Sequence, residues 1–139
     1  MRDFAIAYFE EAEHDINSAT VLLRAGEFAR SVQHSLEAAE KAVKGLLTMR
    51  GQGTLLKHDV SNSLLELLQE KEDKKIRESF ELLIEIERYV GRARYPTRSH
   101  GKIVMPSRFF TEDIAKKCLD ASKKISQNLK GVSGLQTKT

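Results

Sequence analysis

Apolar residues recur along most of the chain at alternating steps of three and four, the spacing that places them on one face of an α-helix. The repeat is clearest in residues 28–50, which we predict to be the central helix. The same spacing predicts helices over residues 3–24, 59–70 and 73–90, and a fifth helix that starts at Thr111. The predicted buried stripes, helix by helix, are Ala5, Phe9, Ala12, Ile16, Ala19 and Leu23; Val32, Leu36, Ala39, Val43, Leu46 and Leu47; Val60, Leu64, Leu67 and Leu68; Ile76, Phe80, Leu83, Ile84 and Val90; and Ile114, Cys118, Ala121, Ile125 and Leu129.

Turn and capping residues separate these helices. Gly26 offers a turn after the first helix, and the charged residues 70–75 are typical of a solvated turn. Thr111 is a suitable N-cap, with acids in the first turn after it. Both prolines, Pro96 and Pro106, fall between the fourth and fifth helices, and no segment shows strand-like alternation. The prediction is an all-α fold, a five-helix up-and-down bundle.

The fourth helix carries more apolar surface than one bundle contact needs. Leu82 and Tyr89 lie off its predicted stripe. A surplus of this kind favours a self-association face and therefore a homodimer. The alternative is a helix that is covered on two sides within one monomer.

Two carboxylates interrupt the apolar stripes. Glu87 falls inside the stripe of the fourth helix, and Asp15 lies at the edge of the first. A buried carboxylate needs a partner, for which Lys44 and Arg94 are the candidates. Lys44 is also four residues beyond Glu40, a favourable helical ion pair. We interpret these charges as structural ion pairs, in preference to catalytic groups.

Composition indicates one globular domain, residues 1–130, followed by a polar tail, residues 131–139, that we expect to be disordered. Hydrophobic residues make up 40% and charged residues 31% of the chain. No apolar run approaches the roughly 20 residues that span a bilayer. Acids interrupt the apolar N-terminal stretch, which excludes a signal peptide. The single cysteine, Cys118, fits a reducing compartment, and we expect a cytoplasmic protein.

Positive charge is concentrated in residues 88–111, which contain six cations and no acid. Because the whole chain has a net charge of +3, the remainder sums to about −3. Aromatic residues lie among the cations and offer surfaces on which bases could stack. The cations are Arg88, Arg92, Arg94, Arg98, Lys102 and Arg108, and the aromatics are Tyr89, Tyr95, Phe109 and Phe110. The segment indicates nucleotide or RNA binding; the alternative is a solvated loop.

Five residues separate Arg94 from His100. Such a pair suits metal-free RNA cleavage, in which the histidine moves a proton and the arginine stabilises charge on the phosphate. A single histidine would need a second copy across a dimer. The four histidines, His14, His34, His58 and His100, are far apart in the sequence and there is no cysteine pair, so we predict no metal site and no cofactor.

An ordered set of short motifs runs through nearly the whole chain. It comprises Ala12, Asp15-Ile16 and Ala19; Leu22-Leu23 and Gly26; Ala38-Ala39-Glu40-Lys41-Ala42-Val43-Lys44 with Leu46-Leu47; His58; Arg94-Tyr95-Pro96; and Phe110-Thr111 with Ala115. In this set the chain resembles the higher eukaryotes and prokaryotes nucleotide-binding (HEPN) family. The resemblance implies a five-helix bundle, usually a homodimer. It also implies a minimal nucleotidyltransferase as partner, in a two-component or toxin–antitoxin pair.

Several branches of this family are ribonucleases with an arginine and a histidine separated by four to six residues, as Arg94 and His100 are. Nuclease members typically carry a small polar residue directly after the arginine, where this chain has Tyr95. Arg94-Tyr95-Pro96 is instead similar to the branch of nucleotide-binding or partner domains.

Three functions remain open from the sequence. The first is a nucleotide-binding, dimeric partner of a nucleotidyltransferase. In this hypothesis Arg92, Arg94, Arg98 and Lys102 contact phosphates and Tyr95 stacks on a base, while Asp15, Glu40, Lys44 and Glu87 support the local geometry. The second is a metal-independent RNA endonuclease toxin that uses Arg94 and His100. The third is a helical scaffold without a ligand.

Overall fold

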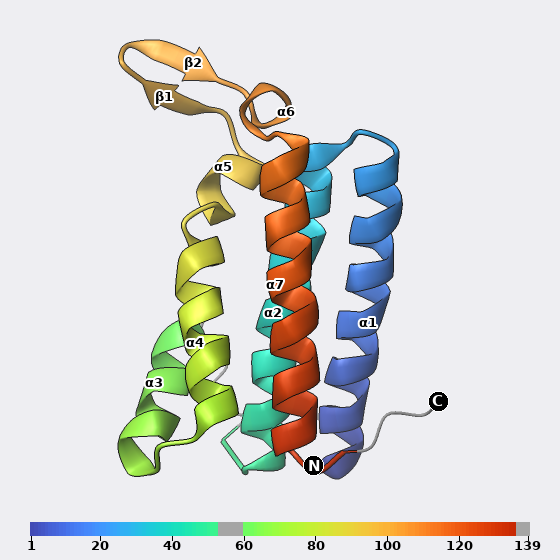
Figure 1. The fold of residues 1–139 in the computed structure, drawn as a ribbon, viewed down its shortest axis with the longest axis vertical. Coiled ribbons are helices and arrows are strands. Elements are labelled where there is room, and N and C mark those ends of the chain that lie inside the picture. Colours follow the sequence, from blue (N-terminus) through green and yellow to red (C-terminus); the bar gives the residue numbers. More distant parts are fainter. Residues whose placement is uncertain (53–59, 136–139) are drawn as a thin grey trace.

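The computed structural model describes residues 1–52 and 60–135. Three long helices lie side by side: α1 (Arg2–Arg24), α2 (Phe28–Met49) and α7 (Glu112–Val132). A shorter pair, α3 (Val60–Glu70) and α4 (Lys74–Glu87), flanks α2 and α7 (Figure 1). Helix α2 is central, since it packs against α1, α7 and α3 and against the short helix α5 (Val90–Arg94).

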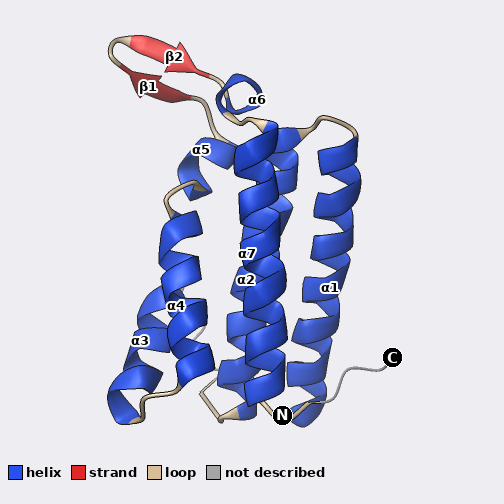
Figure 2. Cartoon of the chain, in the orientation of Figure 1, coloured by secondary structure: helices blue, strands red, loops and turns tan. Residues whose placement is uncertain are grey.

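The described residues also contain elements that the sequence analysis did not predict. After α5 come two antiparallel strands, β1 (Thr97–Ser99) and β2 (Lys102–Val104), and then the short helix α6 (Pro106–Phe109). Figure 2 shows this hairpin as a projection beyond one end of the bundle. The all-helical bundle is therefore confirmed for the long elements, whereas the prediction of no strand is wrong.

Periodicity located four of the five buried stripes correctly. The stripe residues of α2 and α3 are all buried, and those of α1 and α7 are buried except for the half-buried Ile16, Leu23 and Ile114. Thr111 caps α7 as predicted, because its Oγ1 accepts a hydrogen bond from the Ile114 backbone N–H at 3.3 Å. Asp73 caps α4 in the same way. His58 and Asp59, at the predicted start of the third helix, lie outside the described residues.

The predicted face of the fourth helix is correct only in part. Ile76 and Leu83 are buried and Phe80 packs against the core, but Ile84 and Val90 are 49% and 38% exposed. Ser79 and Ile86, which the prediction left out, are buried. The small Ser79 lets α4 approach α7, where the Asn128 side chain donates to the Ser79 hydroxyl and to Glu78. The helix also ends at Glu87, three residues earlier than predicted, and the chain changes direction before α5.

The two residues on which the predicted self-association surface rested do not form an exposed apolar face. Tyr89 is buried and Leu82 is half-buried against the core, whereas Ile84 and Val90 are exposed. Glu87 is half-buried at the end of α4, outside the true stripe. Dimerisation itself stays a prediction.

The predicted boundary between domain and tail also moves. Helix α7 continues to Val132, and Leu135 packs into the hydrophobic core with 6% of its surface exposed. Residues 136–139 lie outside the described residues.

Candidate functional site

Helix α5, the β1–β2 hairpin and α6 form the end of the molecule that carries the acid-free segment (Figure 1). Three aromatic rings fix this end to the bundle. The Phe110 ring centroid lies 5.7 Å from that of Tyr89 and 4.9 Å from that of Phe109. Because Tyr89 and Phe110 are buried and Phe109 is half-buried, these rings are structural. The prediction that they offer base-stacking surfaces is wrong, and Tyr95, 66% exposed, is the aromatic that remains for that role.

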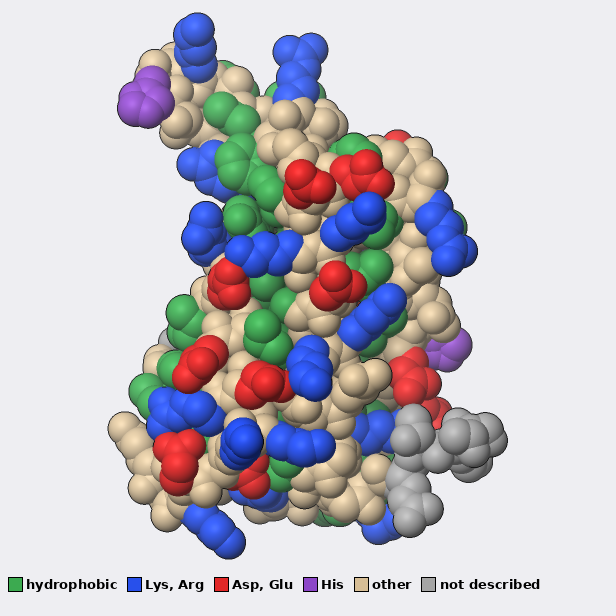
Figure 3. Space-filling view, viewed as in Figure 1, with side chains coloured by type: hydrophobic (Ala, Val, Ile, Leu, Met, Phe, Trp, Pro, Cys, Tyr) green, Lys and Arg blue, Asp and Glu red, His purple; other side chains and the backbone are tan. Residues whose placement is uncertain are grey.

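We call the six cations of this end the cationic patch. They lie at the junction of α4 and α5, on α5, on both strands of the hairpin and on α6: Arg88, Arg92, Arg94, Arg98, Lys102 and Arg108. Two of them lie on aromatic faces, with the Arg92 guanidinium 4.6 Å from the Phe109 ring centroid and that of Arg88 5.0 Å from Tyr89. The other four are exposed. Arg94 forms a salt bridge with Glu37 of α2. Figure 3 shows basic side chains on and below the hairpin, with acidic side chains beside them at the top of the bundle.

Local sequence explains why this end projects. Tyr95 precedes a proline, which disfavours helical backbone, and it is extended at φ −134° and ends α5. His100 and Gly101 form the hairpin turn, with φ of 50° and 78°. Positive φ at both residues is what a type I′ turn requires. Glycine adopts this conformation freely, whereas histidine does so at a cost.

Arg94 and His100 do not meet in one chain. Arg94 sits at the end of α5, where its guanidinium is 4.0 Å from the Glu37 carboxylate of α2. His100 is exposed in the hairpin turn, the part of the hairpin farthest from α5 in Figure 1. A joint catalytic role for these two side chains would therefore involve two copies of the chain.

The supporting charges pair differently from the prediction. Asp15, which is nearly buried, accepts a hydrogen bond from Lys41 Nζ at 2.6 Å, and neither Lys44 nor Arg94 is its partner. Lys44 pairs with Glu40 at 3.1 Å, as the spacing predicted. Burial lowers the pKa of Lys41, but the hydrogen bond and charge of Asp15 and the nearby glutamates outweigh it, so this pKa is raised.

His34 lies beside the same carboxylate. Its Nδ1 is 3.5 Å from Asp15 Oδ1 and 3.7 Å from Glu37 Oε2, and one ligand atom from each of these three residues falls within 4.8 Å of the others. The three side chains could hold a metal ion. Sequence reasoning missed this group because it compared histidines only with one another, and Asp15 is far from His34 in the chain.

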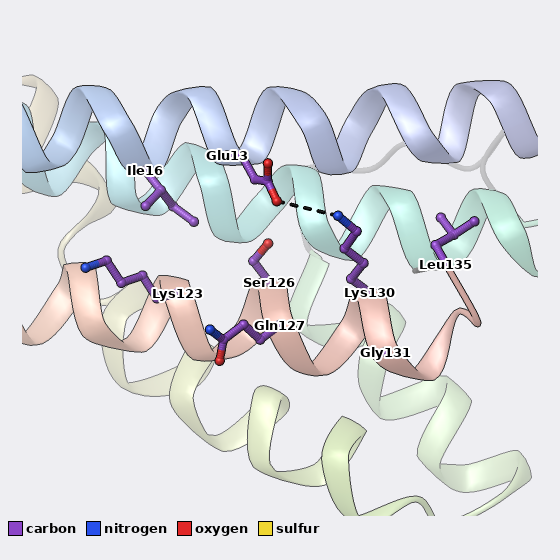
Figure 4. Close-up of a pocket in the computed structure, with 8 residues that line it drawn as sticks. All are labelled: Glu13, Ile16, Lys123, Ser126, Gln127, Lys130, Gly131 and Leu135. Atoms are coloured by element: carbon purple, nitrogen blue, oxygen red, sulfur yellow. Dashed lines mark hydrogen bonds and ion pairs between the residues drawn. The ribbon is translucent and has the colours of Figure 1, made fainter. Parts of the chain in front are cut away.

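A pocket of about 500 Å³ lies between α1 and α7. In Figure 4 the Glu13 and Lys130 side chains meet across it at 3.5 Å, with Ser126 beside them on α7. The charges of Glu13 and Lys130 compensate each other in this ion pair. The residues that line the pocket include no member of the cationic patch. Cys118 is inaccessible within the core, where burial raises its pKa to about 11. It is therefore no nucleophile.

Comparison with known proteins decides the family. A sequence profile of the HEPN domain matches residues 5–132, nearly the whole described structure. The chain belongs to the HEPN family.

Relatives of this HEPN chain agree in fold over most of their length. "Putative toxin MJ1304" of Methanocaldococcus jannaschii is 27% identical over 132 residues, which cover 91% of this chain and 86% of that protein. The crystal structure of TT1696 from Thermus thermophilus has a TM-score of 0.78 at 26% identity and covers 91% of this chain and 96% of its own. ST0689, an archaeal HEPN homologue, has a TM-score of 0.73 at 23% identity, covering 93% and 97%.

These matches confirm the resemblance found in the sequence, together with a mainly helical HEPN-like fold. Among the described residues, no helix has the length and apolar character needed to cross a membrane.

Proposed function

We propose that this HEPN protein binds the phosphates of a nucleotide or RNA on its cationic patch and works as one component of a toxin–antitoxin pair. A minimal nucleotidyltransferase is the partner that its resemblance to small family members implies. The archaeal relative named as a toxin supports the assignment to such a pair.

The observation that carries the proposal is the charge of one end of the molecule. Four arginines and lysines on α5, the hairpin and α6 are exposed, and residues 88–111 contain no acid that could neutralise them. Arginine and lysine in such density favour phosphate, the guanidinium through paired hydrogen bonds. Tyr95 stands among them with 66% of its surface exposed and can stack on a base.

The first test compares two charge deletions at opposite ends of the bundle. Arg98→Ala removes an exposed cation of β1 whose recorded hydrogen bond, to the Gly101 carbonyl, is 3.5 Å long, so the fold should be unaffected. Lys71→Ala removes an exposed cation at the turn between α3 and α4. We expect Arg98→Ala to weaken binding of a labelled single-stranded RNA or of ATP several-fold in fluorescence anisotropy, and Lys71→Ala to leave it unchanged. Equal affinities for wild type and Arg98→Ala would argue against the patch as the phosphate site.

A second function, metal-independent RNA cleavage, is favoured by the position of His100. The hairpin carries this exposed histidine away from the bundle, where it can reach the Arg94 of a second copy. In the reaction, the 2′-hydroxyl would attack phosphorus and pass its proton to one histidine. The 5′-oxygen would leave with a proton from the histidine of the other copy, so that a 2′,3′-cyclic phosphate remains. Arg94 would stabilise the charge that develops on the phosphate.

His100→Asn is the informative variant for this second function. Asparagine tolerates the positive φ of the turn better than alanine does, so the hairpin keeps its geometry while the proton-transfer group is removed. An end-labelled structured RNA incubated in EDTA should be cleaved by wild type, and about 10²–10⁴-fold more slowly by His100→Asn. Intact RNA with both proteins would exclude the nuclease and leave phosphate binding. Absence of both cleavage and binding would leave a helical scaffold.

A further inference from the structure

A compact group of metal-binding atoms lies where α1, α2 and α5 meet. Asp15 comes from α1, and His34 and Glu37 come from successive turns of α2. A histidine and a glutamate three residues apart on one helix point in the same direction, which is why such pairs recur in the metal sites of helical bundles. Asp15 is 9% exposed, so its carboxylate faces the other two side chains from within the fold.

The distances between these atoms suit an ion better than a hydrogen bond. His34 Nδ1 is 3.5 Å from Asp15 Oδ1 and 3.7 Å from Glu37 Oε2. Both separations exceed the roughly 2.7–3.2 Å of a good N–H···O hydrogen bond. Ligands at about 2.0–2.2 Å from a tetrahedral zinc ion lie about 3.3–3.6 Å from one another. The two separations at the imidazole are therefore within a few tenths of an ångström of this spacing, and all three ligand atoms lie within 4.8 Å of one another.

The outer oxygen of each carboxylate faces a cation of its own. Asp15 Oδ2 accepts the hydrogen bond from Lys41 Nζ at 2.6 Å, and Glu37 Oε1 faces the Arg94 guanidinium at 4.0 Å. Each carboxylate thus turns one oxygen to a cation and the other to His34. This is how outer partners orient the ligands of a metal centre. The two positive charges also oppose a second positive ion, so we expect moderate affinity rather than tight structural binding.

We propose that Asp15 Oδ1, His34 Nδ1 and Glu37 Oε2 bind one divalent transition-metal ion, with zinc the best match, and leave one coordination position open. A nitrogen ligand and only three protein atoms favour zinc or its neighbours over magnesium and calcium, which take oxygen ligands in larger number. None of the three ligands belongs to the cationic patch, and the two sites share only Arg94, which faces the Glu37 carboxylate.

Calorimetric titration of the full chain with zinc chloride, after treatment with EDTA and its removal, tests this site without any RNA. Wild type should bind one equivalent at the site, and His34→Gln and Asp15→Asn should weaken that binding more than about tenfold. His14→Gln is the matched control, because His14 is exposed on α1 and lies outside the group. This variant should bind as wild type does.

Should Asp15→Asn fail to fold, His34→Gln remains usable, because this side chain is 37% exposed. Cobalt added in place of zinc should give the visible absorption of a tetrahedral centre in wild type and in His14→Gln only. Absence of zinc binding by wild type, or equal binding by His34→Gln, would overturn the proposal and leave an ion-pair network.

Discussion

Replacing Gly45 with alanine is expected to lower the free energy of unfolding by about 1–2 kcal/mol. A β-carbon built at this position of α2 would lie 2.7 Å from Cε2 and 2.9 Å from Cζ of the Phe9 ring on α1. Phe9 is 1% exposed and packed on all sides, so the ring cannot move aside without displacing the core. Overpacking of this kind costs about 1–3 kcal/mol, and the higher helix propensity of alanine returns up to about 1 kcal/mol.

Gly131→Ala is the control, because it shows the effect of helix propensity without a clash like that between Gly45→Ala and the Phe9 ring. Gly131 also lies within a helix, α7, but a β-carbon there would meet nothing within 4 Å. This substitution should raise stability by up to about 1 kcal/mol. The midpoint of thermal or urea unfolding, followed by circular dichroism, should therefore fall for Gly45→Ala and rise for Gly131→Ala. A Gly45→Ala protein as stable as wild type would mean that α1 and α2 do not approach as closely as the structure has them.

The sequence predicted the long helices well because their signal is repeated many times. In α2, six stripe residues over more than four turns agree on one face, and every one of them is buried. Capping chemistry added the correct N-cap Thr111. The HEPN resemblance rested on the same stretches and was confirmed.

Where a buried face includes polar residues or an element is very short, the prediction was incomplete or wrong. In α4 the true contact uses Ser79, a polar residue that periodicity does not count, and the helix ends at Glu87. The strands of the hairpin have three residues each, too few to show alternation, and their turn is formed by His100 and Gly101 in place of the usual asparagine and glycine. Both errors lie next to the candidate site. The sequence therefore identified the residues of the cationic patch, but not how the backbone arranges them.

The charge partner of Asp15 was predicted wrongly for a different reason. Asp15 and Lys41 are on different helices, and which of the two lysines on α2 faces Asp15 depends on the offset of α1 along α2. Spacing in the sequence fixes pairs within one helix, such as Glu40 and Lys44, but carries no information about that offset. The Asp15, His34 and Glu37 group could not be found for the same reason.

Tyr95→Ala should weaken binding of single-stranded RNA by about 1–3 kcal/mol, the value of one base stacked on an aromatic ring. Tyr95 is 66% exposed and extended at the end of α5, so the side chain supports no packing that its loss would disturb. Tyr95→Phe keeps the ring and removes the hydroxyl, and should bind almost as wild type does. Anisotropy titrations of the three proteins against one labelled RNA would give these affinities.

The dependence of affinity on salt separates stacking from phosphate contact. Tyr95→Ala should lower affinity equally at every salt concentration, because stacking releases no counterions. Loss of a phosphate contact in Arg98→Ala should reduce the slope of log affinity against log salt by about 0.7 for a single strand.

An equal loss of affinity in Tyr95→Phe and Tyr95→Ala would show that the hydroxyl makes the contact, and would argue against stacking. A patch that binds only through charge would show the slope change in Arg98→Ala and no effect of Tyr95. A site in which both variants behave as expected holds a base and its phosphate together, so its ligand would be a nucleotide or a single strand and not a duplex backbone alone.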